Sequence, residues 1–109
     1  MKTIDETPDV WVVLKITSPQ HGTVYKLLSG WFAGYLGSDE WRINSGIDLI
    51  EELSDCYIVT GYSGTVYKCY KACERLSGYT SSIYVGLQKD INSRPECSME
   101  IVKMQDIKL

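Results

Sequence analysis

Gly22-Thr-Val-Tyr-Lys26 recurs unchanged as Gly64-Thr-Val-Tyr-Lys68, and this repeated pentapeptide is the most informative feature of the chain. Each copy follows a short polar turn, which itself follows an apolar run rich in β-branched residues, at residues 11–16 and 56–60. A strand, a glycine-containing turn and a returning strand of Thr, Val and Tyr form the pattern of a β-hairpin. The repeat therefore predicts two similar hairpins and says little about chemistry.

The segments around the hairpins predict an α+β protein. Residues 41–44, 47–52 and 96–104 read as further strands, in which apolar and polar side chains alternate loosely. Thr80 offers a hydroxyl cap, and after it apolar residues recur at helical spacing. We expect one antiparallel sheet of five or six strands built from the two hairpins, with a single helix near residues 80–91.

Length and composition describe one globular domain. The chain has 109 residues, of which 44% are hydrophobic and 23% charged, and this balance argues against disorder. Residues 1–8 are mostly polar and end at Pro8, so we expect a flexible tail before a single domain at residues 9–109. The net charge of −3 disfavours duplex nucleic acid as a partner. The sequence shows neither an apolar stretch of the roughly 20 residues that span a membrane nor a secretory signal, which favours the cytoplasm.

Residue types that carry catalysis or bind metals are sparse. The four cysteines lack the paired spacing of a zinc site, and the only histidine, His21, falls in a predicted turn. Asp39 and Glu40 are neighbours in the chain, so their side chains would point to opposite faces of a strand. The sequence contains no phosphate-binding glycine loop and no nucleophile motif. We therefore expect no enzymatic activity, no metal and no cofactor.

The aromatic residues are the most suggestive feature. The chain has eight tyrosines and three tryptophans but one phenylalanine, and Tyr and Trp are enriched in recognition surfaces. Four aromatic residues and three glycines fall between Ser29 and Trp41. We predict a non-enzymatic interaction module that binds a protein partner through this segment and a nearby turn. The predicted contact residues are Trp31, Phe32, Tyr35, Trp41 and Tyr62.

Two other functions and a dimer stay open. Aromatic residues interleaved with cations suit single-stranded nucleic acid, on whose bases they stack. Such residues are Tyr67, Lys68, Tyr70, Lys71 and Arg75. A small hydrolase or metal-dependent enzyme would use Asp39, Glu40 or Asp48. An exposed sheet edge or aromatic patch would also allow a homodimer.

Two strings of residues carry a resemblance to a known group of proteins. The strings are Gly30-Trp-Phe-Ala-Gly-Tyr-Leu-Gly-Ser-Asp-Glu-Trp-Arg-Ile-Asn-Ser-Gly46 and Gly61-Tyr-Ser-Gly-Thr-Val-Tyr-Lys-Cys69. They resemble small uncharacterised proteins encoded by tailed phages and prophages. The resemblance rests on glycine and aromatic residues and contains no catalytic motif. It implies a bacterial cytoplasm and an accessory protein that binds and modulates a host protein.

Overall fold

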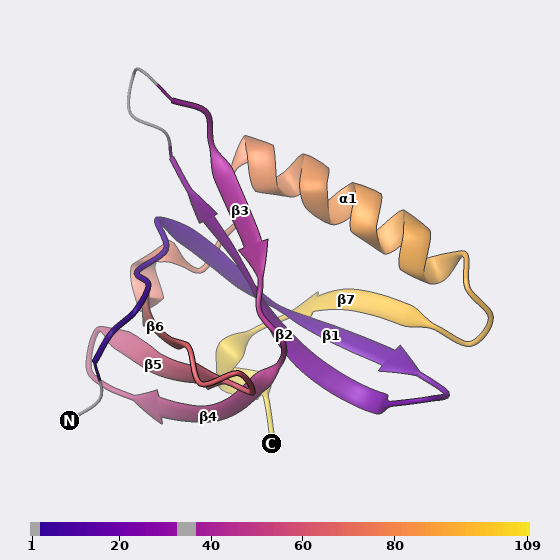
Figure 1. The fold of residues 1–109 in the computed structure, drawn as a ribbon, viewed down its shortest axis with the longest axis horizontal. Coiled ribbons are helices and arrows are strands. Elements are labelled where there is room, and N and C mark those ends of the chain that lie inside the picture. The colour runs from indigo at the N-terminus through magenta and orange to yellow at the C-terminus, as the bar shows by residue number, and fades with distance from the viewer. Residues whose placement is uncertain (1–2, 33–36) are drawn as a thin grey trace.

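The computed structural model describes residues 3–32 and 37–109, which form seven strands, one α-helix and two short 3-10 helices (Figure 1). In chain order these elements are β1 (Val10–Ser18), β2 (Gly22–Trp31), β3 (Glu40–Ile43), β4 (Ile47–Glu52), β5 (Cys56–Gly61), β6 (Val66–Tyr70), η1 (Lys71–Cys73), α1 (Gly78–Asn92), β7 (Ser98–Val102) and η2 (Met104–Asp106). The α+β class and the single helix are confirmed for the described residues.

The strands form two antiparallel sheets, whereas the sequence led us to expect one sheet of five or six strands. A four-stranded sheet has the order β3-β2-β1-β7, and a three-stranded sheet has the order β4-β5-β6. The chain leaves the first sheet after β3, where Asn44 is almost fully buried and Gly46 has a φ of 142°. The Asn44 side chain accepts a hydrogen bond from the Leu27 amide (2.8 Å) and donates one to the Gly46 carbonyl (3.3 Å). This corner directs β4 into the second sheet.

Both faces of the four-stranded sheet are covered. One face packs on the three-stranded sheet through a cluster that includes Trp11, Leu27 and Val59. The other face carries a second cluster, including Leu14 and Leu28, against which residues of α1 pack. In Figure 1, α1 and the sheet β4-β5-β6 accordingly lie on opposite sides of β1 and β2. A strand buried on both faces shows no polar alternation, which explains the continuous apolar run at the start of β1.

The repeated pentapeptide builds two hairpins, as predicted. Gly22 and Gly64 have φ values of 64° and 94°, in the region where glycine is favoured because it lacks a Cβ. Each opens the return from a turn, into β2 and toward β6. Tyr25 and Tyr67, the fourth residues of the two copies, both contact the cluster between the sheets. The repeat is therefore one structural solution used twice.

The helix begins earlier than its sequence pattern indicates. Ser77 is the N-cap, and its hydroxyl accepts a hydrogen bond from the Thr80 amide (3.0 Å). The Thr80 hydroxyl accepts one from the Ser77 amide in return (2.8 Å), which completes a capping box. Thr80 thus caps the helix from its first turn instead of preceding it. No helix of the described residues is long and apolar enough to cross a membrane.

The expected N-terminal tail is attached to the domain along its described part. The amides of Asp5 and Glu6 donate to the Val66 carbonyl, and the Lys68 amide donates to the Glu6 carbonyl. Pro8 is fully buried. Polar composition misled the prediction, because this segment is held by backbone hydrogen bonds and by the polar side chains of Asp5 and Glu6 as well as by the buried Pro8.

Candidate functional site

The predicted aromatic surface is partly assembled at one end of the β2–β3 hairpin. Trp31 ends β2, Phe32 follows it, and Trp41 lies in β3 directly opposite Gly30. Phe32 is 51% exposed and Trp41 is 39% exposed. Figure 1 shows these ends of β2 and β3 reaching away from the three-stranded sheet. We call Trp31, Phe32 and Trp41 the hairpin-end surface.

Trp31 is held in place from two directions. Its indole N–H donates to the Thr7 carbonyl (3.2 Å), and the Arg42 guanidinium lies 5.8 Å from the ring centroid. Arg42 is itself fixed by an ion pair with Glu6 (2.9 Å). The N-terminal segment therefore positions a half-buried tryptophan at the hairpin end. A ring that is already ordered loses little side-chain entropy when a partner binds.

The backbone beside Phe32 is fixed in the same way, although its ring is exposed. The Phe32 amide donates to the Asp9 carboxylate (2.7 Å), and the Asp9 amide donates to the Gly30 carbonyl (3.0 Å). These bonds tie the end of β2 to the start of β1. The exposed Phe32 ring therefore projects from a segment whose backbone is fixed by hydrogen bonds.

The two tryptophans lie on opposite faces of the hairpin. Gly30 faces the start of α1, since a Cβ at this position would meet the methyl group of Thr80. Trp41 pairs with Gly30 and shares its face, whereas Trp31, the next residue in β2, points to the other face. The hairpin-end surface consequently wraps around an edge of the sheet.

The structure separates Tyr62 from this surface, and Tyr35 lies outside the described residues. Tyr62 is 59% exposed, and its amide donates to the Gly46 carbonyl (2.9 Å). Its ring packs against Gly46, which lies after the C-terminal end of β3. Trp31 pairs with Glu40 at the N-terminal end of the same strand. The prediction that Tyr62 shares a surface with the tryptophans does not hold, because the β3–β4 corner carries it to the other end of the hairpin.

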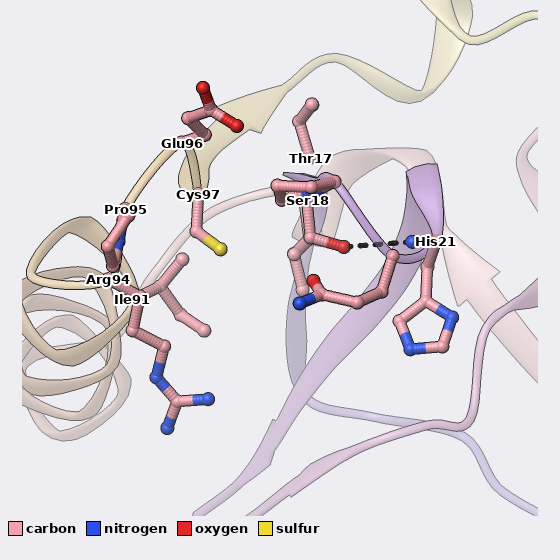
Figure 2. A pocket seen from close by; sticks show the side chains of 11 residues that line it. Thr17, Ser18, His21, Ile91, Arg94, Pro95, Glu96 and Cys97 are labelled. Carbon is pink, nitrogen blue, oxygen red and sulfur yellow. Dashed lines mark hydrogen bonds between the residues drawn. The ribbon is translucent and has the colours of Figure 1, made fainter.

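A separate cavity of about 600 Å³ lies between the β1–β2 turn and the chain that follows α1 (Figure 2). Its lining includes His21, Arg94 and Cys97. In Figure 2 the Cys97 thiol faces the space while the Glu96 carboxylate points away from it. The His21 amide donates to the Ser18 hydroxyl (3.2 Å), and the Arg94 guanidinium pairs with Asp90 (3.0 Å). We find no hydrogen bond between His21 and Cys97 in the described structure, so these side chains are not arranged as a nucleophile and its base.

His21 lies in the expected turn, but no pattern in the sequence indicates this cavity. A second cavity, of about 470 Å³, adjoins it and shares His21 and Ile16 in its lining. Lys26 and Tyr62 also line this second space. Segments far apart in the chain form both cavities, and no local pattern in any one of them indicates the neighbour.

The residues considered for nucleic-acid binding do not form a stacking platform. Tyr67 is buried between the sheets, and burial raises the pKa of its hydroxyl. Lys71 pairs with Glu52 (2.7 Å) and lies over the ring of Tyr57. Lys68 lies 5.0 Å from the centroid of the Tyr70 ring. One of the two aromatic residues is therefore unavailable to a base, and both of these lysines already have partners.

The carboxylates considered for metal chemistry are dispersed. Glu40 lies in β3 and Asp48 in β4, which belong to different sheets. Among residues 3–32 and 37–109, no three His, Cys, Asp or Glu side chains gather closely enough to hold a metal ion. The four cysteines are free thiols, and burial strongly raises the pKa of Cys69.

Comparisons with protein-family models, with curated proteins and with solved structures give no match to this chain. The hairpin-end surface and the two adjoining cavities are therefore interpreted from their own geometry.

Proposed function

We propose that this chain is a non-enzymatic interaction module that binds a protein partner through the hairpin-end surface. The observation that carries the proposal is the exposure of two large apolar side chains, Phe32 and Trp41, beside a tryptophan that the N-terminal segment already holds in place. Aromatic anchors of this kind supply most of the binding energy of protein interfaces. The surface is small and built on a braced hairpin, which suits recognition more than chemistry.

Burial of these side chains by a partner would contribute favourably to the free energy of binding. About half of the Phe32 side chain, or roughly 100 Å², stays exposed to water in the free protein. Burying that area in a partner would contribute about 2.5 kcal/mol, and Trp41 would contribute a similar amount. The ordered ring of Trp31 adds contact area at a low entropic cost.

We further propose that the partner is a protein of a bacterial host and that the chain acts as a phage or prophage accessory protein. The similarity of the two glycine/aromatic strings to small phage proteins supports this assignment. The hairpin-end residues lie within the first of those strings, so the resemblance and the exposed aromatic residues coincide. Binding would modulate the host protein by occupying or distorting the surface that it covers.

Capture from bacterial lysate by the immobilised chain tests the proposal, followed by calorimetry with the captured protein. The Phe32→Ala and Trp41→Ala variants should each weaken binding by about tenfold or more, as expected for anchors worth about 2 kcal/mol. Leu49→Ala is the matched control, since Leu49 is 54% exposed but lies in β4 on the other sheet. If the control weakens binding as much as the hairpin variants, or if those variants bind normally, the proposed surface is wrong.

A further inference from the structure

Among the described residues, two of the four outer sheet edges are covered and the pairing of a third edge strand is irregular. The outer edge of β7 is closed by α1, since the Asn92 side chain accepts from the Met99 amide (3.3 Å) and the Gln88 side chain donates to the Met99 carbonyl (3.1 Å). The outer edge of β6 is closed by the N-terminal segment, which bonds to the backbone of Val66 and Lys68. Such coverage prevents unwanted strand pairing.

The edge of β4 is open but unsuited to pairing with β4 of a second copy of the chain. Its pairing with β5 is irregular between Ile47 and Leu49, and an irregularity of this type bends a strand. The strand also carries Asp48, Glu51 and Glu52 and no cation. Two copies of β4 would therefore bring like charges together.

The edge of β3 is open and regular. The Asn44 amide donates to the Leu27 carbonyl, which fixes the alternation of bonded pairs along β2 and β3. By this alternation Arg42 is bonded to β2, whereas the N–H and C=O groups of Trp41 and Ile43 point outward. Within the described residues we find no partner for those outward groups, and Glu40, Trp41 and Arg42 are all exposed.

We propose that β3 is a self-association edge, at which two copies of this chain pair antiparallel about a twofold axis at Trp41. The four strands of each copy then form one continuous sheet of eight. The Trp41 N–H of each copy donates to the Trp41 carbonyl of the other, and the two indole rings meet on the face toward α1. This inference rests on the backbone of β3 and does not depend on the proposed function.

Charge complementarity selects both the occupant and the register. With the axis at Trp41, Glu40 of each copy lies opposite Arg42 of the other, so two pairs of opposite charge flank the central bonds. With the axis at Arg42, two guanidinium groups would face each other instead. A strand that carries one acid and one base on the same face, two residues apart, is complementary to itself when it is inverted.

The short strand limits the affinity. Only four residues of β3 pair with β2, and an interface of this size belongs to the weak, transient class. We expect a dissociation constant between about 10 µM and about 1 mM. Trp41 also belongs to the hairpin-end surface, so self-association and partner binding compete by mass action.

Sedimentation equilibrium of the full chain up to about 1 mM provides the first test, with a reversible monomer–dimer equilibrium as the expected result. Hydrogen exchange identifies the strand that pairs, because the Trp41 amide should exchange more slowly as the protein concentration rises. A chain that stays monomeric at about 1 mM, or a dimer in which the exchange of this amide does not depend on concentration, overturns the proposal.

A charge exchange tests the register. Glu40→Arg and Arg42→Glu should each weaken the homodimer by about tenfold or more, because each places like charges opposite one another. An equimolar mixture of the two variants should form a heterodimer at least as tight as the wild-type dimer. Arg42→Glu also removes the ion pair with Glu6, but a variant that had lost its fold would not be rescued by mixing. Undiminished homodimers, or the absence of a heterodimer, would show that this register is wrong.

Phe32→Ala separates this inference from the proposed function. Phe32 lies outside β3, so its removal should leave the dimer unchanged while it weakens capture of a partner. Loss of the dimer in this variant would count against pairing at β3. Failure of the lysate capture alone would count against the proposed function and leave the dimer standing.

Discussion

Replacing Gly30 by alanine should destabilise the protein, although the change adds only one methyl group. Gly30 lies in β2, directly opposite Trp41 in β3. An added Cβ would lie 2.5 Å from the Thr80 methyl carbon and 3.1 Å from a Val10 methyl carbon. Thr80 and Val10 are 2% and 1% exposed, so neither can move into solvent. The packing of α1 on the sheet must therefore shift.

The expected cost follows from two effects. Overpacking of a closed core typically costs 1–3 kcal/mol. Thr80 also completes the capping box with Ser77, and disturbing a helix cap costs about 1 kcal/mol. Alanine recovers about 0.4–1 kcal/mol by restricting the unfolded chain. We expect the free energy of unfolding to fall by roughly 1–3 kcal/mol.

The same substitution at Gly86 is the matched control. Gly86 lies inside α1, and a Cβ built there meets nothing within 4 Å. Gly86→Ala should therefore raise the free energy of unfolding by about 0.5–1 kcal/mol, because alanine favours the helix. Urea unfolding followed by far-ultraviolet circular dichroism would measure both changes against the wild type.

A second-site change identifies the clash itself. Thr80→Ser removes the methyl group that Gly30→Ala would strike and keeps the hydroxyl of the capping box. In a double-mutant cycle, the cost of Gly30→Ala should be clearly smaller in the Thr80→Ser background. If Gly30→Ala is neutral, or if its cost is the same in both backgrounds, Thr80 does not pack over Gly30 as described and the basis for placing Trp41 on this face is lost.

Two further outcomes are expected. Burial raises the pKa of the Cys69 thiol and of the Tyr67 hydroxyl. As pH rises, the unfolded chain therefore loses these protons before the folded chain does. The free energy of unfolding should be constant near neutral pH and should fall as pH rises above about 9. Cys69→Ala should remove the contribution of the Cys69 thiol to this fall in the free energy of unfolding, which urea titrations between pH 7 and 10.5 would measure. An unchanged pH dependence would contradict the burial of Cys69. Deleting residues 1–8 should lower the unfolding midpoint and speed hydrogen exchange of the Lys68 amide, which loses the Glu6 carbonyl. Unaltered exchange would show that this segment is the free tail that its composition predicted.

The hairpins and the helix were predictable because their determinants are local. Gly22 and Gly64 adopt positive φ values, which are unfavourable for residues with a Cβ, and β-branched residues flank both turns. The helical periodicity after Thr80 is likewise contained within a few turns. The N-terminal segment has no such marker, since its bonds join Asp5 to Val66 across 61 positions. The attachment of this segment was therefore missed.

In the candidate site too, local features were predictable from the sequence, whereas contacts between distant segments were not. Glycine and aromatic residues around Trp31 and Trp41 indicated a surface, and the structure exposes Phe32 and Trp41 there. It could not be read from the sequence that Trp31 would be bound by the N-terminal segment or that the corner at Gly46 would carry Tyr62 away. It was equally hidden that His21 would line a cavity.

Local sequence is enough to specify which segments of this protein are strands and which is a helix, because steric preferences and side-chain periodicity act over a few residues. The division of the strands into two sheets, the covering of the edges of β6 and β7 and the open edge of β3 arise only from tertiary contacts. Those outcomes depend on hydrogen bonds and packing between segments that are distant in the chain. The repeated pentapeptide shows the contrast, since the same five residues lead into the returning strand of a hairpin twice, but one hairpin belongs to the four-stranded sheet and the other to the three-stranded sheet.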